Sequence, residues 1–276
     1  MSKNINFFKN KITETWPGKK GILTEFIFYL KEKLHLSDVS IYVDDYSLSK
    51  DEEDSINQFI ALKKQEVPLD YILEKSSFYG NNFFVDPRVL IPRPETEILV
   101  DFINKLNFQS GEIVIDAGTG SGCIGISLAI HNPHIKVYGL DFSKESLEVA
   151  NKNKNNLKVE NFATIYSDWL SNIEDASCNL IVSNPPYISS EDKHLRDLHH
   201  EPLMALTALD NGLADFKTIS SQASSKLLKG GMLAFEHGYK QKREVSEILK
   251  KNGFKNIETL KDHQSHPRIT IGILSN

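Results

Sequence analysis

The chain has 276 residues, of which 40% are hydrophobic and 25% charged, a composition typical of a soluble globular protein. The formal net charge of −5 argues against a protein that binds nucleic acid through a broad basic face. Cys123 and Cys178 lack the CxxC spacing of a metal or redox site, so we expect two buried thiols. We find no signal-peptide core and no apolar run of about 18 residues, which predicts a cytoplasmic protein without a membrane span.

Residues 1–75 carry helical patterns and predict a small α-helical domain. Apolar residues recur at helical spacing between residues 21 and 36, which predicts one helix there. A second helix is predicted to begin near residues 49–54, where acidic side chains suit a helix N-terminus. It should end near residue 65, before Pro68.

Residues 76–97 predict a hairpin followed by an extended linker. Residues 77–85 read as two short strands with a turn at Gly80, Asn81 and Asn82. Three prolines follow, at positions 87, 92 and 94, and they are expected to keep the backbone extended.

From residue 98 onward, short apolar strands alternate with helices. The predicted strands are 112–117, 136–140, 163–167, 179–183 and 232–236, and the predicted helices are 122–131, 144–155, 213–228 and 241–252. This alternation predicts a parallel sheet covered by helices on both faces. Strands 255–260 and 268–274 are separated by a loop too short for a helix, so this last pair must be antiparallel. Such a sheet is typical of nucleoside-binding methyltransferases.

A glycine-rich loop follows the first of these strands and precedes an apolar helix. It contains Gly118, Thr119, Gly120, Ser121 and Gly122. A loop of this kind lets a ligand approach the backbone and leaves N–H groups free at the helix start. The GxGxG spacing differs from the GxGxxG of dinucleotide sites, and no GxxxxGK[ST] loop is present.

Two acidic residues flank this loop in the predicted fold. Asp141 closes the next strand about 20 residues after the last glycine, where a carboxylate can accept hydrogen bonds from both ribose hydroxyls. Its alternative role is a helix N-cap. Asp116 could either bond an N–H group of the loop or face the amino-acid moiety of a cofactor, and both alternatives remain open.

The most specific motif is the tetrapeptide Asn184, Pro185, Pro186 and Tyr187, directly after the apolar strand. Ligands of parallel sheets bind at the carboxyl ends of strands, so this motif should lie beside the glycine loop. Asn184 supplies a side-chain carbonyl, and Pro185 supplies a backbone carbonyl held by the restricted φ of proline. Tyr187 offers a flat surface for a planar group. A rigid surface turn is the alternative reading.

These acceptors suit a planar amide nitrogen, which is a poor nucleophile because its lone pair is delocalised. An acceptor for each N–H would hold this nitrogen and favour the geometry of attack. Methyl transfer from a sulfonium needs neither a metal nor a strong base, so positioning is the main contribution expected from the protein. No metal site is predicted, and the cluster His199, His200 and Glu201 is not expected to bind one.

The chain resembles the release-factor glutamine methyltransferases, known as HemK or PrmC. The matching segments are residues 68–73, 91–97, 116–122, 167–169, 182–188 and 236–238. The resemblance implies an α/β class I methyltransferase with a Rossmann-like seven-stranded sheet, the last strand antiparallel, behind a small N-terminal helical domain. It implies S-adenosylmethionine as cofactor. It also implies transfer to the side-chain nitrogen (N5) of the Gly-Gly-Gln glutamine of bacterial class-1 release factors.

The resemblance also implies roles for particular residues and regions. Contacts to the cofactor are implied for Gly118, Thr119, Gly120, Ser121, Gly122, Asp141, Trp169 and Asn184. Asn184, Pro185, Pro186 and Tyr187 would hold the glutamine, with Asn184, Pro185 and Tyr187 as the catalytic set. Residues 1–75 would recognise the substrate, residues 76–97 would link, and residues 98–276 would form the methyltransferase domain. The implied partner is a release factor, with no membrane and no direct nucleic acid.

Other functions share part of these features. Methyltransferases of exocyclic amines in DNA or RNA, and of a ribosomal-protein glutamine, resemble the tetrapeptide, whereas residues 93–97 favour the release-factor branch. A non-catalytic binding module is a further alternative. Trp169 could be a core aromatic, His237 a structural histidine, and Arg93 with Glu97 a linker salt bridge. The segment 262–266 differs from the family versions.

Overall fold

The computed structural model describes residues 4–42 and 46–275. The chain divides into two compact units, Met1–Lys75 and Ser76–Asn276, called here the N-terminal and C-terminal units. In the described part of the chain, we find no helix that is both long and apolar enough to cross a membrane.

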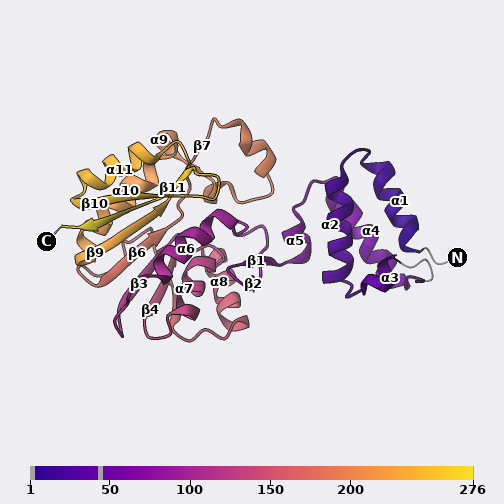
Figure 1. The fold of residues 1–276 in the computed structure, drawn as a ribbon, viewed down its shortest axis with the longest axis horizontal. Helices are drawn as coiled ribbons and strands as arrows, with labels where there is room; N and C mark the ends of the chain where they lie inside the picture. The colour runs from indigo at the N-terminus through magenta and orange to yellow at the C-terminus, as the bar shows by residue number, and fades with distance from the viewer. Residues whose placement is uncertain (1–3, 43–45, 276) are drawn as a thin grey trace. The chain divides into compact units, whose positions relative to one another are not determined.

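The described part of the N-terminal unit contains the helices α1 Ile5–Thr15, α2 Lys20–Glu32, α3 Asp38–Tyr42, α4 Lys50–Lys64 and α5 Leu69–Leu73 (Figure 1). The two predicted helices correspond to α2 and α4. Helix α4 begins with a capping box, in which the Ser49 side chain accepts from the Glu52 N–H and the Glu52 side chain accepts from the Ser49 N–H. Helix α2 ends four residues earlier than predicted, before the left-handed residue His35.

Helices α1, α3 and α5 were not predicted, although the apolar spacing of α1 is visible in the sequence. Ile5, Phe8 and Ile12 recur at helical spacing along α1, and all three are buried in the core of the unit. Asn4 caps this helix, because its side-chain oxygen accepts from the Phe7 N–H at 2.9 Å.

The C-terminal unit begins with a hairpin of β1 Ser76–Phe78 and β2 Asn81–Phe83. The predicted turn was misplaced, because Tyr79 and Gly80 form it with φ of 47° and 75°, and Asn81 and Asn82 belong to β2. Two consecutive positive φ values match the twist that a two-residue hairpin requires. Pro94 does not extend the chain either, since it begins the 3₁₀ helix η1 Pro94–Thr96, a position that suits its fixed φ.

Seven strands form the main sheet in the order β10-β11-β9-β6-β3-β4-β5. Their bounds are β3 Ile113–Ala117, β4 Lys136–Asp141, β5 Phe162–Tyr166, β6 Cys178–Ser183, β9 Leu227–Glu236, β10 Phe254–Lys261 and β11 Pro267–Leu274. Strand β11 runs antiparallel to both β9 and β10, and the other pairs are parallel. The predicted fold class is therefore confirmed.

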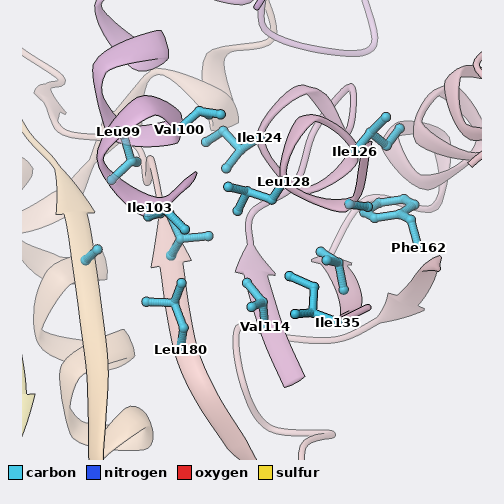
Figure 2. Close-up of a cluster of buried hydrophobic side chains, with 14 of the residues drawn as sticks. Leu99, Val100, Ile103, Val114, Ile124, Ile126, Leu128, Ile135, Phe162 and Leu180 are labelled. Carbon is cyan, nitrogen blue, oxygen red and sulfur yellow. The ribbon is translucent and has the colours of Figure 1, made fainter. Parts of the chain in front are cut away.

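Helices cover both faces of this sheet (Figure 1). Helices α6 Glu97–Asn104 and α7 Cys123–His131 pack on one face, α10 Ala214–Lys226 and α11 Lys242–Lys251 on the other, and α8 Lys144–Asn156 connects β4 to β5. Val114 and Ile115 are consecutive in β3 yet belong to different clusters, as the alternation of a strand requires. Figure 2 shows side chains of α6 and α7 gathered over Val114 and Leu180.

A long excursion separates β6 from α10. It contains the short elements β7 Ile188–Ser189, η2 Lys193–Leu198, η3 Leu203–Ala205, β8 Thr207–Ala208 and α9 Leu209–Gly212. It starts at the carboxyl end of β6, next to β3. The sheet order changes direction between these two strands, because β4 and β5 lie on one side of β3 and β6 and β9 lie on the other. Ligands of open α/β sheets bind at this position.

Candidate active site

A cavity of about 390 Å³ opens at the carboxyl ends of β3, β4 and β6. Five of the residues predicted to contact a cofactor line it, namely Gly118, Gly120, Asp141, Trp169 and Asn184. Its walls also include Arg88, Leu90, Phe142, Met204, Leu209 and Asp215, for which the sequence carried no signal. The fold thus brings together residues from six separate segments of the chain.

The three glycines of the loop differ in the space around them. All have positive φ, at 76°, 53° and 82° for Gly118, Gly120 and Gly122. A Cβ on Gly118 would lie 3.1 Å from the Trp169 ring, whereas one on Gly120 would meet no atom within 4 Å. A Cβ on Gly122 would stand 2.7 Å from Ile126 Cδ1. Gly120 therefore leaves room beside the cavity, while Gly122 allows α7 to pack closely.

Thr119 and Asp116 hold the loop from behind, outside the cavity lining. Asp116 Oδ2 accepts from Thr119 Oγ1 at 2.6 Å and from the Gly125 N–H at 2.9 Å. Asp116 is fully buried, and this burial raises the pKa of its carboxyl to about 6. The structure thus shows Asp116 bonding to the loop and helix start. Ser121, which is buried, and Gly122, which caps α7, are also not among the residues that line the cavity.

Asp141 lies at the cavity wall with both oxygens engaged by backbone groups. Its Oδ2 accepts from the Gly120 N–H and its Oδ1 from the Ser143 N–H, each at 2.9 Å. Burial raises the pKa of this carboxyl. The N-cap of α8 is Ser143, whose side chain accepts from the Ser146 N–H, so the N-cap alternative for Asp141 is wrong. A carboxylate accepts about four hydrogen bonds, so capacity remains for a ligand.

Trp169 also lines this cavity and has a strained backbone conformation. Its φ is 48°, a left-handed value that costs a bulky residue on the order of 1–3 kcal/mol. Its side chain is hydrogen-bonded to Asp215, whose pKa burial raises. The ring also packs against the hydrophobic cluster of the sheet, so Trp169 is both a cavity wall and a core aromatic.

A second cavity of about 300 Å³ adjoins the first. Arg93, Pro185, Tyr187, Leu198 and Leu206 contribute to its walls. Asn184 and Pro186 line both cavities, as do Leu90 and Ala205, so the tetrapeptide forms part of the wall that the two cavities share. A group bound in one cavity would meet a group bound in the other at this motif.

The tetrapeptide is anchored through both side chains and backbone. Asn184 Nδ2 donates to Thr96 Oγ1 at 3.3 Å. The backbone carbonyl of Tyr187 accepts from Gln241 Nε2 at 3.1 Å. Burial raises the pKa of the Tyr187 hydroxyl, so the ring stays neutral at physiological pH. Pro185 is buried and the other three residues are half-buried, so the motif is a packed, anchored segment and not a surface turn.

Glu236 ends strand β9 and His237 follows it, and both residues are buried. The His237 ring lies 2.8 Å from Thr270 Oγ1 through Nε2 and 2.9 Å from the Gly238 carbonyl through Nδ1. Burial lowers the pKa of this histidine, which keeps the ring neutral. With both nitrogens engaged by protein groups, His237 is a structural histidine.

Arg93 pairs with a different carboxylate from the one expected. Its Nη2 lies 2.6 Å from Glu201 Oε1, and Glu201 Oε2 accepts from the Ile91 N–H at 3.1 Å. Glu97 accepts instead from the Tyr79 N–H at 2.9 Å, so the alternative of an Arg93–Glu97 salt bridge is wrong. Among the residues whose side chains the structure describes, no group of three His, Cys, Asp or Glu could hold a metal ion.

Comparisons with known proteins agree with this geometry. Residues 94–266 match the family model described as methyltransferase small domain. The release factor glutamine methyltransferase of Vibrio cholerae is 41% identical over 79% of this chain and 77% of its own length. The protein of the same name from Buchnera aphidicola subsp. Schizaphis graminum is 36% identical over 98% of both chains.

Solved structures support the fold independently. A methyltransferase from Pyrococcus furiosus superimposes with a TM-score of 0.55 at 16% identity, covering 83% of this chain and all of that one. Together, the sheet order, the loop, the tetrapeptide between two cavities and these relatives show that the chain is a methyltransferase and belongs to the release factor glutamine methyltransferase family.

Proposed function

We propose that the chain transfers a methyl group from S-adenosylmethionine to the side-chain amide nitrogen (N5) of the glutamine in the Gly-Gly-Gln motif of bacterial class-1 release factors. The observation that carries this proposal is the place of the tetrapeptide, with Asn184 and Pro186 lining both cavities. The names of the relatives point to release factor glutamine as the acceptor.

The first cavity fits S-adenosylmethionine. Asp141 retains acceptor capacity for the ribose beyond the backbone N–H groups of Gly120, Ser143 and Phe142. Gly120 leaves open space where any other residue would carry a Cβ atom. Asp141, Asp168 and Asp215 give the walls acidic groups, which suit a ligand that carries a sulfonium and an ammonium. When bound, this cofactor supplies an electrophilic methyl group.

The second cavity fits the side chain of a glutamine. Asn184 Nδ2 is engaged by Thr96, which leaves Asn184 Oδ1 as the acceptor for one N–H of the substrate amide. The Pro185 carbonyl would accept the other N–H. Two acceptors hold the amide nitrogen toward the first cavity, and aligned groups of this kind reach effective molarities of about 10⁵ M or more.

Proton removal needs no dedicated base. As the new N–CH₃ bond forms and the S–CH₃ bond breaks, the amide nitrogen becomes cationic and strongly acidic. Its proton then passes to solvent. The substrate amide and Asn184 are both neutral, so the site does not depend on a charged nucleophile.

A methylation assay with labelled cofactor tests the proposal. Intact release factor, the same factor with the Gly-Gly-Gln glutamine replaced by Ala, and DNA are offered in parallel. We expect label only in the intact factor, at the glutamine, as located by mass spectrometry. Label in DNA alone, or in a ribosomal protein alone, would refute the proposed acceptor. Retained label in the Ala variant would refute the proposed position.

We also assign the N-terminal unit to recognition of the release factor. A small helical unit with its own core can present a stable surface to a protein substrate. Exchange of exposed residues of this unit, such as Phe28→Ala, should raise KM for intact release factor without changing the affinity for cofactor. Unchanged KM for a set of such variants would remove this assignment.

A further inference from the structure

Thr96 occupies the N-cap position of α6 but makes no capping hydrogen bond with its own helix. A threonine at this position ordinarily accepts an N–H of the first helical turn. The Thr96 hydroxyl instead accepts from Asn184 Nδ2 at 3.3 Å and is hydrogen-bonded to the Glu236 carboxylate. Thr96 is only 2% exposed, so water cannot substitute for these partners.

The three residues meet because β6 and β9 are neighbouring parallel strands. Ser183 pairs with Phe235, so Asn184 and Glu236 follow at equivalent ends of the two strands. The segment that leads into α6 places Thr96 against both ends. Glu236 is 1% exposed, and its Oε2 has no hydrogen-bond partner among the described residues. Burial of a carboxylate with an unpaired oxygen costs folding free energy. This cost suggests a functional role for Glu236.

The chemistry of the three groups sets the direction of the hydrogen bonds. When Glu236 is ionised, its carboxylate can only accept, so Thr96 then donates its single proton to Glu236. The Thr96 oxygen then has lone pairs alone to offer to Asn184, which must present its NH₂ group. The amide oxygen of Asn184 is thereby turned away from Thr96.

We propose that Thr96 and Glu236 are positioning residues, which lock the amide of Asn184 so that Oδ1 faces the acceptor nitrogen. The inference rests on the proposed function and adds to it the cause of the amide orientation. Asparagine amides rotate readily between two states in which O and N exchange places. In the rotated state the Asn184 NH₂ would oppose the substrate NH₂, and no hydrogen bond could form.

Protonation of Glu236 would reverse the chain of donors. A neutral Glu236 could donate to Thr96, and Thr96 could then donate to the Asn184 oxygen, which stabilises the unproductive rotamer. Burial raises the pKa of Glu236 to about 7, so this change falls near neutral pH. The charged or titratable groups that act on it are Arg268 on β11, Arg93 and Glu95 before α6, Tyr187 after β6 and Cys123 on α7.

Thr96→Val and Thr96→Ser test the role of the hydroxyl. Valine keeps the volume and removes the acceptor, whereas serine keeps the hydroxyl. In Thr96→Val we expect kcat to fall about 100-fold, with cofactor Kd and release-factor KM changed less than about threefold. Thr96→Ser should recover most of kcat.

A matched control is available at Thr164 on β5. Its Oγ1 accepts from Asn151 Nδ2 at 2.8 Å, the same pair of residue types outside the site. Thr164→Val should leave kcat unchanged. Equal losses in Thr96→Val and Thr164→Val, or an unchanged kcat in Thr96→Val, would overturn the proposal.

Glu236→Gln tests the carboxylate through the pH profile. In the wild type, kcat should rise with pH through about 7 as Glu236 ionises. In Glu236→Gln the side chain does not titrate, so this limb should vanish, while cofactor binding shows that the variant is folded. An identical limb in both proteins would refute the role of Glu236.

The same assays distinguish a failure of the positioning proposal from a failure of the release-factor proposal. All variants are assayed with whichever acceptor the wild-type chain methylates, because an exocyclic amine needs the same two acceptors as an amide. Label in DNA would end the release-factor proposal but leave the Thr96 comparison intact. Label in release factor with a fully active Thr96→Val would end only the positioning proposal.

Discussion

Gly212 lies directly against the backbone carbonyl of Tyr187. A Cβ atom on Gly212 would stand 2.1 Å from that oxygen, far inside any real contact. Gly212 has a φ of 83°, and it follows Asp210 and Asn211, which are also left-handed. The short helix α9 thus contains a left-handed turn. This turn brings Gly212 into contact with the backbone of the tetrapeptide.

Gly212→Ala should damage activity and stability together. The methyl group must push the Tyr187 carbonyl away, and alanine is also strained at this φ. We expect kcat to fall at least about tenfold and the free energy of unfolding to fall by about 2 kcal/mol. Steady-state kinetics and urea unfolding measure the two effects.

The control for this variant is Gly111→Ala. Gly111 has nearly the same φ, 85°, but a Cβ there would meet nothing within 4 Å. It should show only the backbone effect, a loss of about 1 kcal/mol with unchanged kcat. If both variants keep full activity, the contact between Gly212 and Tyr187 has no catalytic importance.

Asn184→Ala should remove turnover while cofactor binding persists. The side chain supplies one of the two acceptors proposed for the substrate amide, so kcat should fall about 100-fold or more. Cofactor Kd, measured by calorimetry, should rise less than about tenfold, since a single polar contact is lost. Asn179→Ala, at the opposite end of β6, removes a hydrogen bond to the Ile113 N–H and should leave kcat unaltered. A fully active Asn184→Ala would disprove its assigned role.

Asp141→Ala should weaken cofactor binding. It removes the proposed acceptor of the ribose hydroxyls and releases the Gly120 and Ser143 N–H groups that shape the loop. We expect Kd for S-adenosylmethionine to rise about 10- to 100-fold, as for the loss of charge-assisted hydrogen bonds. Asp101→Ala, an exposed carboxylate paired with Lys105, serves as the control and should bind normally. Equal affinity in the two variants would exclude Asp141 from the cofactor site.

Asp116 should make stability depend on pH in a defined direction. Its folded pKa of about 6 lies above the ordinary value of 3.8, so the folded state binds the proton more tightly than the unfolded state. Its favourable contribution is complete below about pH 4 and is lost as pH rises through about 6. The loss is on the order of 3 kcal/mol.

Asp116→Asn removes this titration. The free energy of unfolding of the wild type, minus that of the variant, should therefore decrease between pH 4 and pH 7. Urea unfolding at several pH values without cofactor measures this difference. Parallel curves for the two proteins would show that Asp116 does not titrate in this range.

The hairpin and α1 show where local patterns succeed or fail. Ile5, Phe8 and Ile12 already display the spacing of α1 in the sequence, so this helix was open to prediction. The hairpin turn was not, because Tyr79 takes a left-handed φ that its residue type disfavours. Packing of Phe78 and Phe83 into the core of the C-terminal unit outweighs that local preference.

The sequence by itself determined the sheet, the glycine loop and the position of the tetrapeptide. Each depends on a period or spacing within a few neighbouring residues, and strand ends in a parallel sheet necessarily share one edge. Tertiary structure alone decided which distant groups meet there. Thr96 is 88 residues from Asn184, and Arg93 is 108 residues from Glu201. Such pairs leave no local pattern, because packing of separate elements creates them only when the chain has folded.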